Sequence, residues 1–80
     1  MSKTQLPYLI QEALQIGGWN AVSLNTNNEK YQRGNATVEI GTRPLLGTTP
    51  ASYVFRLALG DHQVNKSEKL PDLCARLAKK

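Results

Sequence analysis

The sequence predicts an α+β fold that forms a single small domain. Two terminal helices are expected to pack on one face of an antiparallel sheet. The sheet is expected to have three strands, or four if a short additional strand forms. Two observations lead to this fold class. The segments that begin Leu6-Pro7 and Leu70-Pro71 both continue with the apolar spacing of a helix. The residues between them alternate apolar and polar side chains and are interrupted by turn formers. The expected order is α-β-β-β-α over residues 1–80, a length that suits one domain and not two.

The first helix is predicted over about Thr4 to Ile16, because apolar residues recur on one helical face from Leu6 to Gly17. Thr4 is the expected N-cap, and Pro7 is compatible with a helix only in its first turn. The pair Gly17-Gly18 then supplies a helix end.

Two strands and a long connection are predicted next. Residues 19–24 form a strand in which Trp19 anchors the core, with an exposed contact for a partner as the alternative role of this side chain. Residues 25–35 have almost no apolar content and are expected to be a long exposed hairpin connection, into which the flanking strands could extend. Residues 36–40 alternate as a half-buried strand that Gly41 ends.

A loop and the strongest strand follow. Residues 43–51 hold two prolines and a glycine and are expected to be irregular, with Leu45 and Leu46 packed against the core. In the strand predicted over residues 53–59, Tyr53, Phe55, Leu57 and Leu59 share the inner face and Arg56 points outward.

The C-terminal part begins with the turn signal Gly60-Asp61, after which residues 62–64 are expected to form either a short continuation or a fourth strand. The last helix is predicted from Leu70 or Pro71 to about Ala78. Its apolar face includes Cys74, which we expect to be a buried structural thiol.

Composition limits the classes of function. The formal charge of +4 and the pI near 9.5 suit a nucleic-acid or acidic-protein partner, although such a charge also serves solubility alone. A single cysteine allows no internal disulfide. Without a signal peptide or a long apolar run, the chain is expected to be cytoplasmic, with no contact to a membrane.

Catalysis is not expected from this sequence. One histidine and one cysteine give no zinc-type spacing, the six carboxylates are scattered, and no phosphate-binding glycine pattern occurs. Asp61 and His62 are adjacent, and adjacent residues on a strand point to opposite faces. We therefore expect no catalytic residue, no metal and no cofactor.

The candidate binding residues centre on the expected connection at 25–35. Two cations there surround one aromatic residue, a pattern that suits stacking with phosphate contact or a protein hot spot, and a solvated hairpin tip is the alternative. A second cationic group lies around the last helix, where free amides could help to hold phosphate. The full set of candidates for contact with a partner or phosphate is Lys30, Tyr31, Arg33, Arg43, Arg56, Lys66, Lys69 and Arg76.

The α-β-β-β-α order resembles that of double-stranded-RNA-binding domains, and residues 9–15 (Leu-Ile-Gln-Glu-Ala-Leu-Gln) are similar to the opening helix of that family. The resemblance spans the chain in topology and the first helix in sequence. The family's histidine-bearing loop is absent, and the lysine cluster that opens its last helix is reduced to Lys66 and Lys69. The resemblance therefore implies a fold and assigns no RNA-binding residue.

Taken together, these features predict a small basic, non-catalytic binding module. Its expected partner is a protein or a ribonucleoprotein complex, and it would act by stoichiometric binding. Accessory proteins of phages and mobile elements are often small, basic binding modules of this kind. One example would be an inhibitor of a host defence complex. One alternative is a domain that binds nucleic acid directly. A second is a homodimeric structural module that pairs through an open sheet edge.

Overall fold

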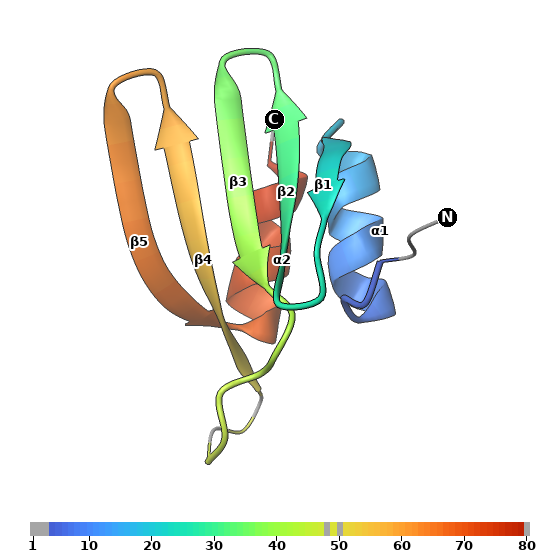
Figure 1. Cartoon of the computed structure of the whole chain (residues 1–80). Helices are drawn as coiled ribbons and strands as arrows, with labels where there is room; N and C mark the ends of the chain where they lie inside the picture. The colour runs from blue at the N-terminus through green and yellow to red at the C-terminus, as the bar shows by residue number, and fades with distance from the viewer. Residues whose placement is uncertain (1–3, 48, 50, 80) are drawn as a thin grey trace.

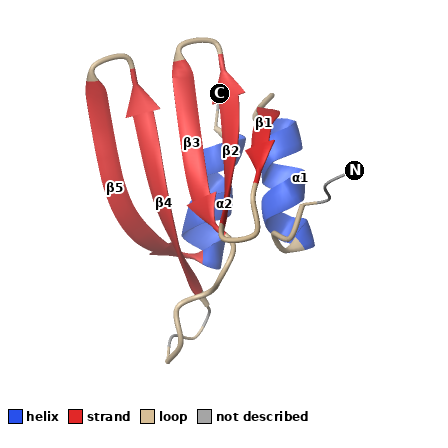
Figure 2. Cartoon of the chain, viewed as in Figure 1, coloured by secondary structure: helices blue, strands red, loops and turns tan. Residues whose placement is uncertain are grey.

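The computed structural model describes residues 4–47, 49 and 51–79. Within them lie two helices and a five-stranded antiparallel sheet (Figures 1 and 2). In chain order the elements are α1 (Tyr8–Ile16), β1 (Asn20–Leu24), β2 (Asn28–Arg33), β3 (Ala36–Gly41), β4 (Ser52–Leu59), β5 (His62–Lys69) and α2 (Leu70–Ala78). The α+β class is confirmed. The sheet has more strands than the predicted three or four, and it departs in this from the order of double-stranded-RNA-binding domains.

Strand β2 occupies most of the expected connection at 25–35, so the prediction of a long loop there was wrong. Its side chains alternate, since Glu29 and Tyr31 are buried while Lys30 and Gln32 are exposed. The sequence pattern concealed this alternation because one of the two inward residues is a carboxylate. Gly34, with φ of +58°, supplies the turn into β3.

Strand β5 extends over eight residues, whereas a short strand was expected. It pairs only with β4 and forms one edge of the sheet. Nearly all of its side chains are exposed, so it lacks the apolar alternation from which strands are recognised. Lys66 and Lys69 lie on this edge strand, where lysines discourage pairing with another chain.

Helix α1 begins at Tyr8, four residues later than predicted. Pro7, with φ of −57° and ψ of 154°, stands at its N-cap. Thr4 is therefore not the N-cap of the helix. Its hydroxyl instead donates a hydrogen bond to Oε1 of Glu29 at 2.6 Å and accepts one from the backbone amide of Leu6 at 3.2 Å. Helix α2 has the predicted bounds, and its N-cap Lys69 is also the last residue of β5.

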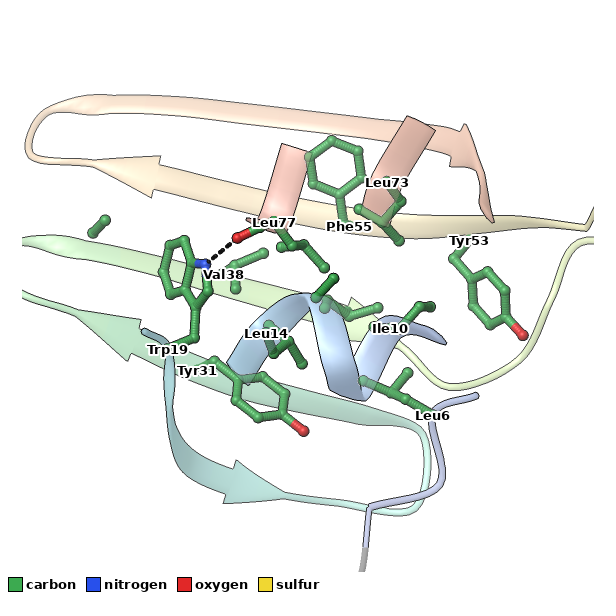
Figure 3. Packing of buried hydrophobic residues seen from close by; sticks show 13 residues of the cluster. Leu6, Ile10, Leu14, Trp19, Tyr31, Val38, Tyr53, Phe55, Leu73 and Leu77 are labelled. Atoms are coloured by element: carbon green, nitrogen blue, oxygen red, sulfur yellow. Dashed lines mark hydrogen bonds between the residues drawn. The ribbon is translucent and has the colours of Figure 1, made fainter. Parts of the chain in front are cut away.

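The core lies between the helices and the sheet (Figure 3). Helices α1 and α2 pack against each other. In Figure 1, α2 lies behind β2 and β3, and α1 lies beside β1. Ile10 and Leu14 of α1 and Leu73 and Leu77 of α2 are buried against Val38, Ile40 and Phe55 of the sheet. The prediction that Trp19 is a core residue is confirmed, since it is buried and its indole Nε1 donates to the carbonyl oxygen of Leu77 at 2.9 Å.

The loop between β3 and β4 extends beyond the end of the sheet (Figure 1). Leu46 is 96% exposed and Leu45 is also exposed, so the prediction that both pack against the core was wrong. The backbone of Leu45 bridges to Ser52, and this pairing directs the rest of the loop away from the core. Leu59 of β4, predicted to face inward, is likewise largely exposed.

Each helix has nine residues and is therefore about 14 Å long. A membrane-spanning helix must cross roughly 30 Å of hydrocarbon. Neither helix found in the described part of the chain is long enough, or continuously apolar enough, to do so.

Candidate functional site

One face of the sheet carries a row of polar side chains, which we call the open face. Its residues alternate along each strand with those that point into the core. The strand register places four of them directly opposite one another on four successive strands, from β2 to β5: Lys30, Glu39, Arg56 and Asn65. Strand pairing therefore assembles a continuous row from residues that are far apart in sequence.

Arg56 lies at the centre of this row. Its Nη1 is 3.8 Å from Oε1 of Glu39, and its Nε donates a hydrogen bond to Oδ1 of Asn65 at 3.2 Å. The side chains of Arg56 and Glu39 are 58% and 35% exposed, so the ion pair contributes little to stability, roughly 0–1 kcal/mol. These contacts orient the groups and leave most of their hydrogen-bonding capacity available to a partner.

Two shallow hollows flank the pair formed by Glu39 and Arg56. The larger, of about 350 Å³, is lined by both polar and apolar groups, and its polar residues include Asn27, Asn28 and Asn65. The smaller, of about 90 Å³, lies on the side of Lys30 and Ala58. The open face thus presents amide, carboxylate and guanidinium groups around two depressions, an arrangement suited to polar recognition.

Tyr31, the aromatic residue at the centre of the expected binding loop, is buried on the opposite side of β2. Its hydroxyl donates to Oε1 of Glu29 at 2.6 Å. Burial, together with the hydrogen bond to Glu29, raises the pKa of Tyr31 to about 12. The ring is therefore not available for stacking on a ligand, and the expected grouping of Lys30, Tyr31 and Arg33 on one surface does not form.

Arg33 also points away from the open face. Its Nη1 donates to the carbonyl oxygens of Gly17 at 2.7 Å and of Lys79 at 2.9 Å. The guanidinium carbon lies 4.4 Å from the centroid of the Trp19 ring. This side chain ties the end of α1 to the end of α2, a structural function that its sequence context does not indicate.

The other predicted cations are dispersed. Arg43 is exposed in the β3–β4 loop, and Lys66 and Lys69 are three positions apart on β5, which places them on opposite faces. Arg76 of α2 forms two hydrogen bonds to the Glu68 carboxylate, at 2.7 and 3.0 Å, and these raise the pKa of Arg76 and lower that of Glu68. The predicted second cationic group is therefore not gathered into one phosphate site.

Glu29 was missed by sequence reasoning. Its carboxylate is fully buried and accepts hydrogen bonds from the hydroxyls of Thr4 and Tyr31, both at 2.6 Å, and from the backbone amide of Gln5 at 2.7 Å. Glu29 thus holds the segment before α1 against β2. The alternation of Glu29 and Tyr31 with Lys30 and Gln32 was the signal that could have revealed it.

No group of three or more histidine, cysteine or acidic side chains with metal-binding geometry occurs among the residues described. His62 lies exposed at the start of β5. Cys74 is half-buried on α2, and burial raises the pKa of its thiol, which disfavours the reactive thiolate.

Comparisons of the chain with protein-family models, with curated proteins and with solved structures find no match.

Proposed function

We propose that the protein is a small non-catalytic binding module that contacts a protein, free or within a ribonucleoprotein complex, through the open face of its sheet. The proposal includes the placement of both helices on one face, because this leaves the other face free for the partner. Binding one partner per molecule would block the covered surface, which is how a stoichiometric inhibitor acts.

The observation that carries the proposal is the exposed row from Lys30 to Asn65. Arginine is enriched among the residues that dominate protein interfaces, and Arg56 lies centrally with the two hollows beside it. Glu39 adds a negative charge between Lys30 and Arg56. A partner with a complementary pattern of charges could therefore be recognised in one register only.

The distribution of aromatic residues favours a protein partner over direct contact with single-stranded nucleic acid. Sheets that bind single strands stack bases on exposed aromatic rings. Here Trp19, Tyr31, Tyr53 and Phe55 are buried, and the fifth aromatic residue, Tyr8, is on helix α1. The central carboxylate of Glu39 would moreover repel phosphate groups.

The test is affinity capture from a lysate of the source cells, with and without nuclease, using two charge-matched variants. Lys30→Ala/Arg56→Ala removes one lysine and one arginine from the open face, whereas Lys66→Ala/Arg43→Ala removes the same charges elsewhere. We expect the captured protein to remain bound after nuclease treatment. Its affinity should be at least tenfold lower for the first variant only, which corresponds to about 1.4 kcal/mol of binding free energy.

If the two variants lose the same affinity for the captured protein, the proposal that the partner binds the open face is refuted. Loss of all captured protein on nuclease treatment, with a steep decrease of binding as salt increases, would instead favour direct nucleic-acid binding. Both variants change exposed side chains, so we expect thermal melts close to that of the unchanged protein.

A further inference from the structure

On the side of the sheet opposite the open face, an apolar groove lies at the C-terminal end of α2; we call it the terminal groove. It has a volume of about 210 Å³, and its apolar lining comes from Trp19, Val38, Leu57, Leu59 and Leu77. Cationic side chains that include Arg33 and Lys79 complete the lining. The groove is formed by residues that come from separate segments of the chain.

The groove is exposed to solvent at the end of β4. Leu59, the last residue of that strand, is 53% exposed. On β5, Val64 lies opposite Leu57 and is 37% exposed, so the apolar surface continues onto the edge strand. Contiguous exposed apolar surface is a feature of interaction sites in monomeric proteins.

The charge at the groove is positive and only partly compensated. Arg76, a third cation of the lining, is paired with Glu68. Arg33 donates to backbone carbonyl oxygens, and neither it nor Lys79 forms an ion pair with any carboxylate that the structure describes. Two positive charges therefore lie beside an apolar surface. The local dielectric constant near such a surface is lower than in water, which strengthens the attraction of these charges for an anion.

We propose that the terminal groove binds a short acidic segment of a protein partner. An aliphatic or aromatic side chain of that segment would occupy the groove beside Leu59, and neighbouring carboxylates would pair with Arg33 and Lys79. The volume is below the roughly 300–1,000 Å³ of pockets that enclose whole small ligands, and it suits a side chain instead. This surface is separate from the open face and does not depend on the function proposed for it.

Trp19, the single tryptophan of the chain, lines the groove, so its fluorescence reports occupancy directly. The probes are three synthetic hexapeptides: Asp-Glu-Leu-Phe-Glu-Asp, the same peptide with two serines in place of Leu-Phe, and the same peptide with lysine in place of every acidic residue. We expect a saturable change in emission for the first peptide only, with an affinity that falls several-fold as salt is raised.

Two groove variants and two matched controls locate the site. Leu59→Ser and Lys79→Glu should each weaken binding of the first peptide at least tenfold. Val22→Ser replaces a side chain that is also 53% exposed, and Lys30→Glu reverses an exposed lysine on the open face; both should bind as the unchanged protein does. Circular dichroism melts identify any variant that fails to fold.

The proposal is overturned if the first peptide gives no saturable change, if all three peptides bind equally, or if the controls lose as much affinity as the groove variants. A change in Trp19 emission with protein concentration alone would assign the groove to a second copy of the chain. A stronger response to an RNA oligonucleotide than to the acidic peptide would assign it to nucleic acid. Because Lys30→Glu tests the open face and not the groove, the two proposals can fail independently.

Discussion

Gly17, at the C-cap of α1, lies close against Leu77 of α2, which makes Gly17→Ala the most informative substitution. A Cβ atom there would overlap the carbonyl oxygen of Leu77 and lie 2.9 Å from Cδ1 and from Nε1 of the Trp19 ring. Gly17 has a φ of −76°, which any residue adopts, so the whole cost of the substitution comes from crowding. Backbone on one side and a buried ring on the other leave little room for relaxation.

The cost has two parts. Forcing an extra carbon into a packed contact costs about 1–3 kcal/mol. Separation of the helix ends also breaks the hydrogen bond from Trp19 to Leu77 (Figure 3) and leaves a buried donor unpaired, at about 1–3 kcal/mol. The sum of about 2–6 kcal/mol compares with a total stability of about 4–8 kcal/mol expected for a chain of this length. Gly17→Ala should thus remove at least about a quarter of the free energy of unfolding, and most of it at the upper end of the range.

Urea unfolding followed by far-ultraviolet circular dichroism measures this loss without relying on the fluorescence of Trp19. Gly41→Ala is the matched control, because the nearest atom to its added Cβ would be the Val54 carbonyl oxygen at an ordinary 3.5 Å. We expect the control to change stability by no more than about 0.5 kcal/mol. If Gly17→Ala falls within that same range, the close approach of the helices is not as described.

Two further predictions concern the core. Since the pKa of Tyr31 is raised from 10 to about 12, its contribution to stability is complete below pH 10 and is lost as the pH rises through 12. Urea midpoints measured across this range should fall less steeply for Tyr31→Phe; an identical slope would contradict the burial of this hydroxyl. Phe55→Ala should cost about 3–5 kcal/mol because the ring is fully buried, while Leu46→Ala should cost almost nothing. If thermal unfolding shows a similar loss of stability for both variants, then the placement of Phe55 in the core and of Leu46 at the loop tip is wrong.

The elements predicted well are those whose burial shows in their own sequence. Helix α2 and strand β4 each have apolar residues at the spacing of one face, which local reading detects. Strand β2 was missed because a buried carboxylate, Glu29, takes a position where an apolar residue was expected. Its burial becomes intelligible only when Thr4 and Gln5, distant in sequence, are known to donate to it.

The candidate binding surfaces were harder to predict from the sequence than the helices and strands. Lys30 and Arg56 were named from the sequence, but their alignment with Glu39 and Asn65 depends on the register of four strands, and no single segment encodes that register. The terminal groove was not predicted either. Leu59 has the sequence pattern of a core residue, yet it stays 53% exposed at the end of β4.

Every strand of this sheet pairs with its immediate neighbour along the chain, whereas α1 and α2 come from opposite ends of the sequence and pack together. Three of the hairpins between these strands, β1–β2, β2–β3 and β4–β5, close over two or three residues, and hairpins can form on a microsecond timescale. Docking of the helices requires closure across most of the chain, which is entropically the more demanding event. We therefore expect the strands to assemble first and the helix pair to join late, so that crowding at Gly17 would accelerate unfolding more than it would slow refolding.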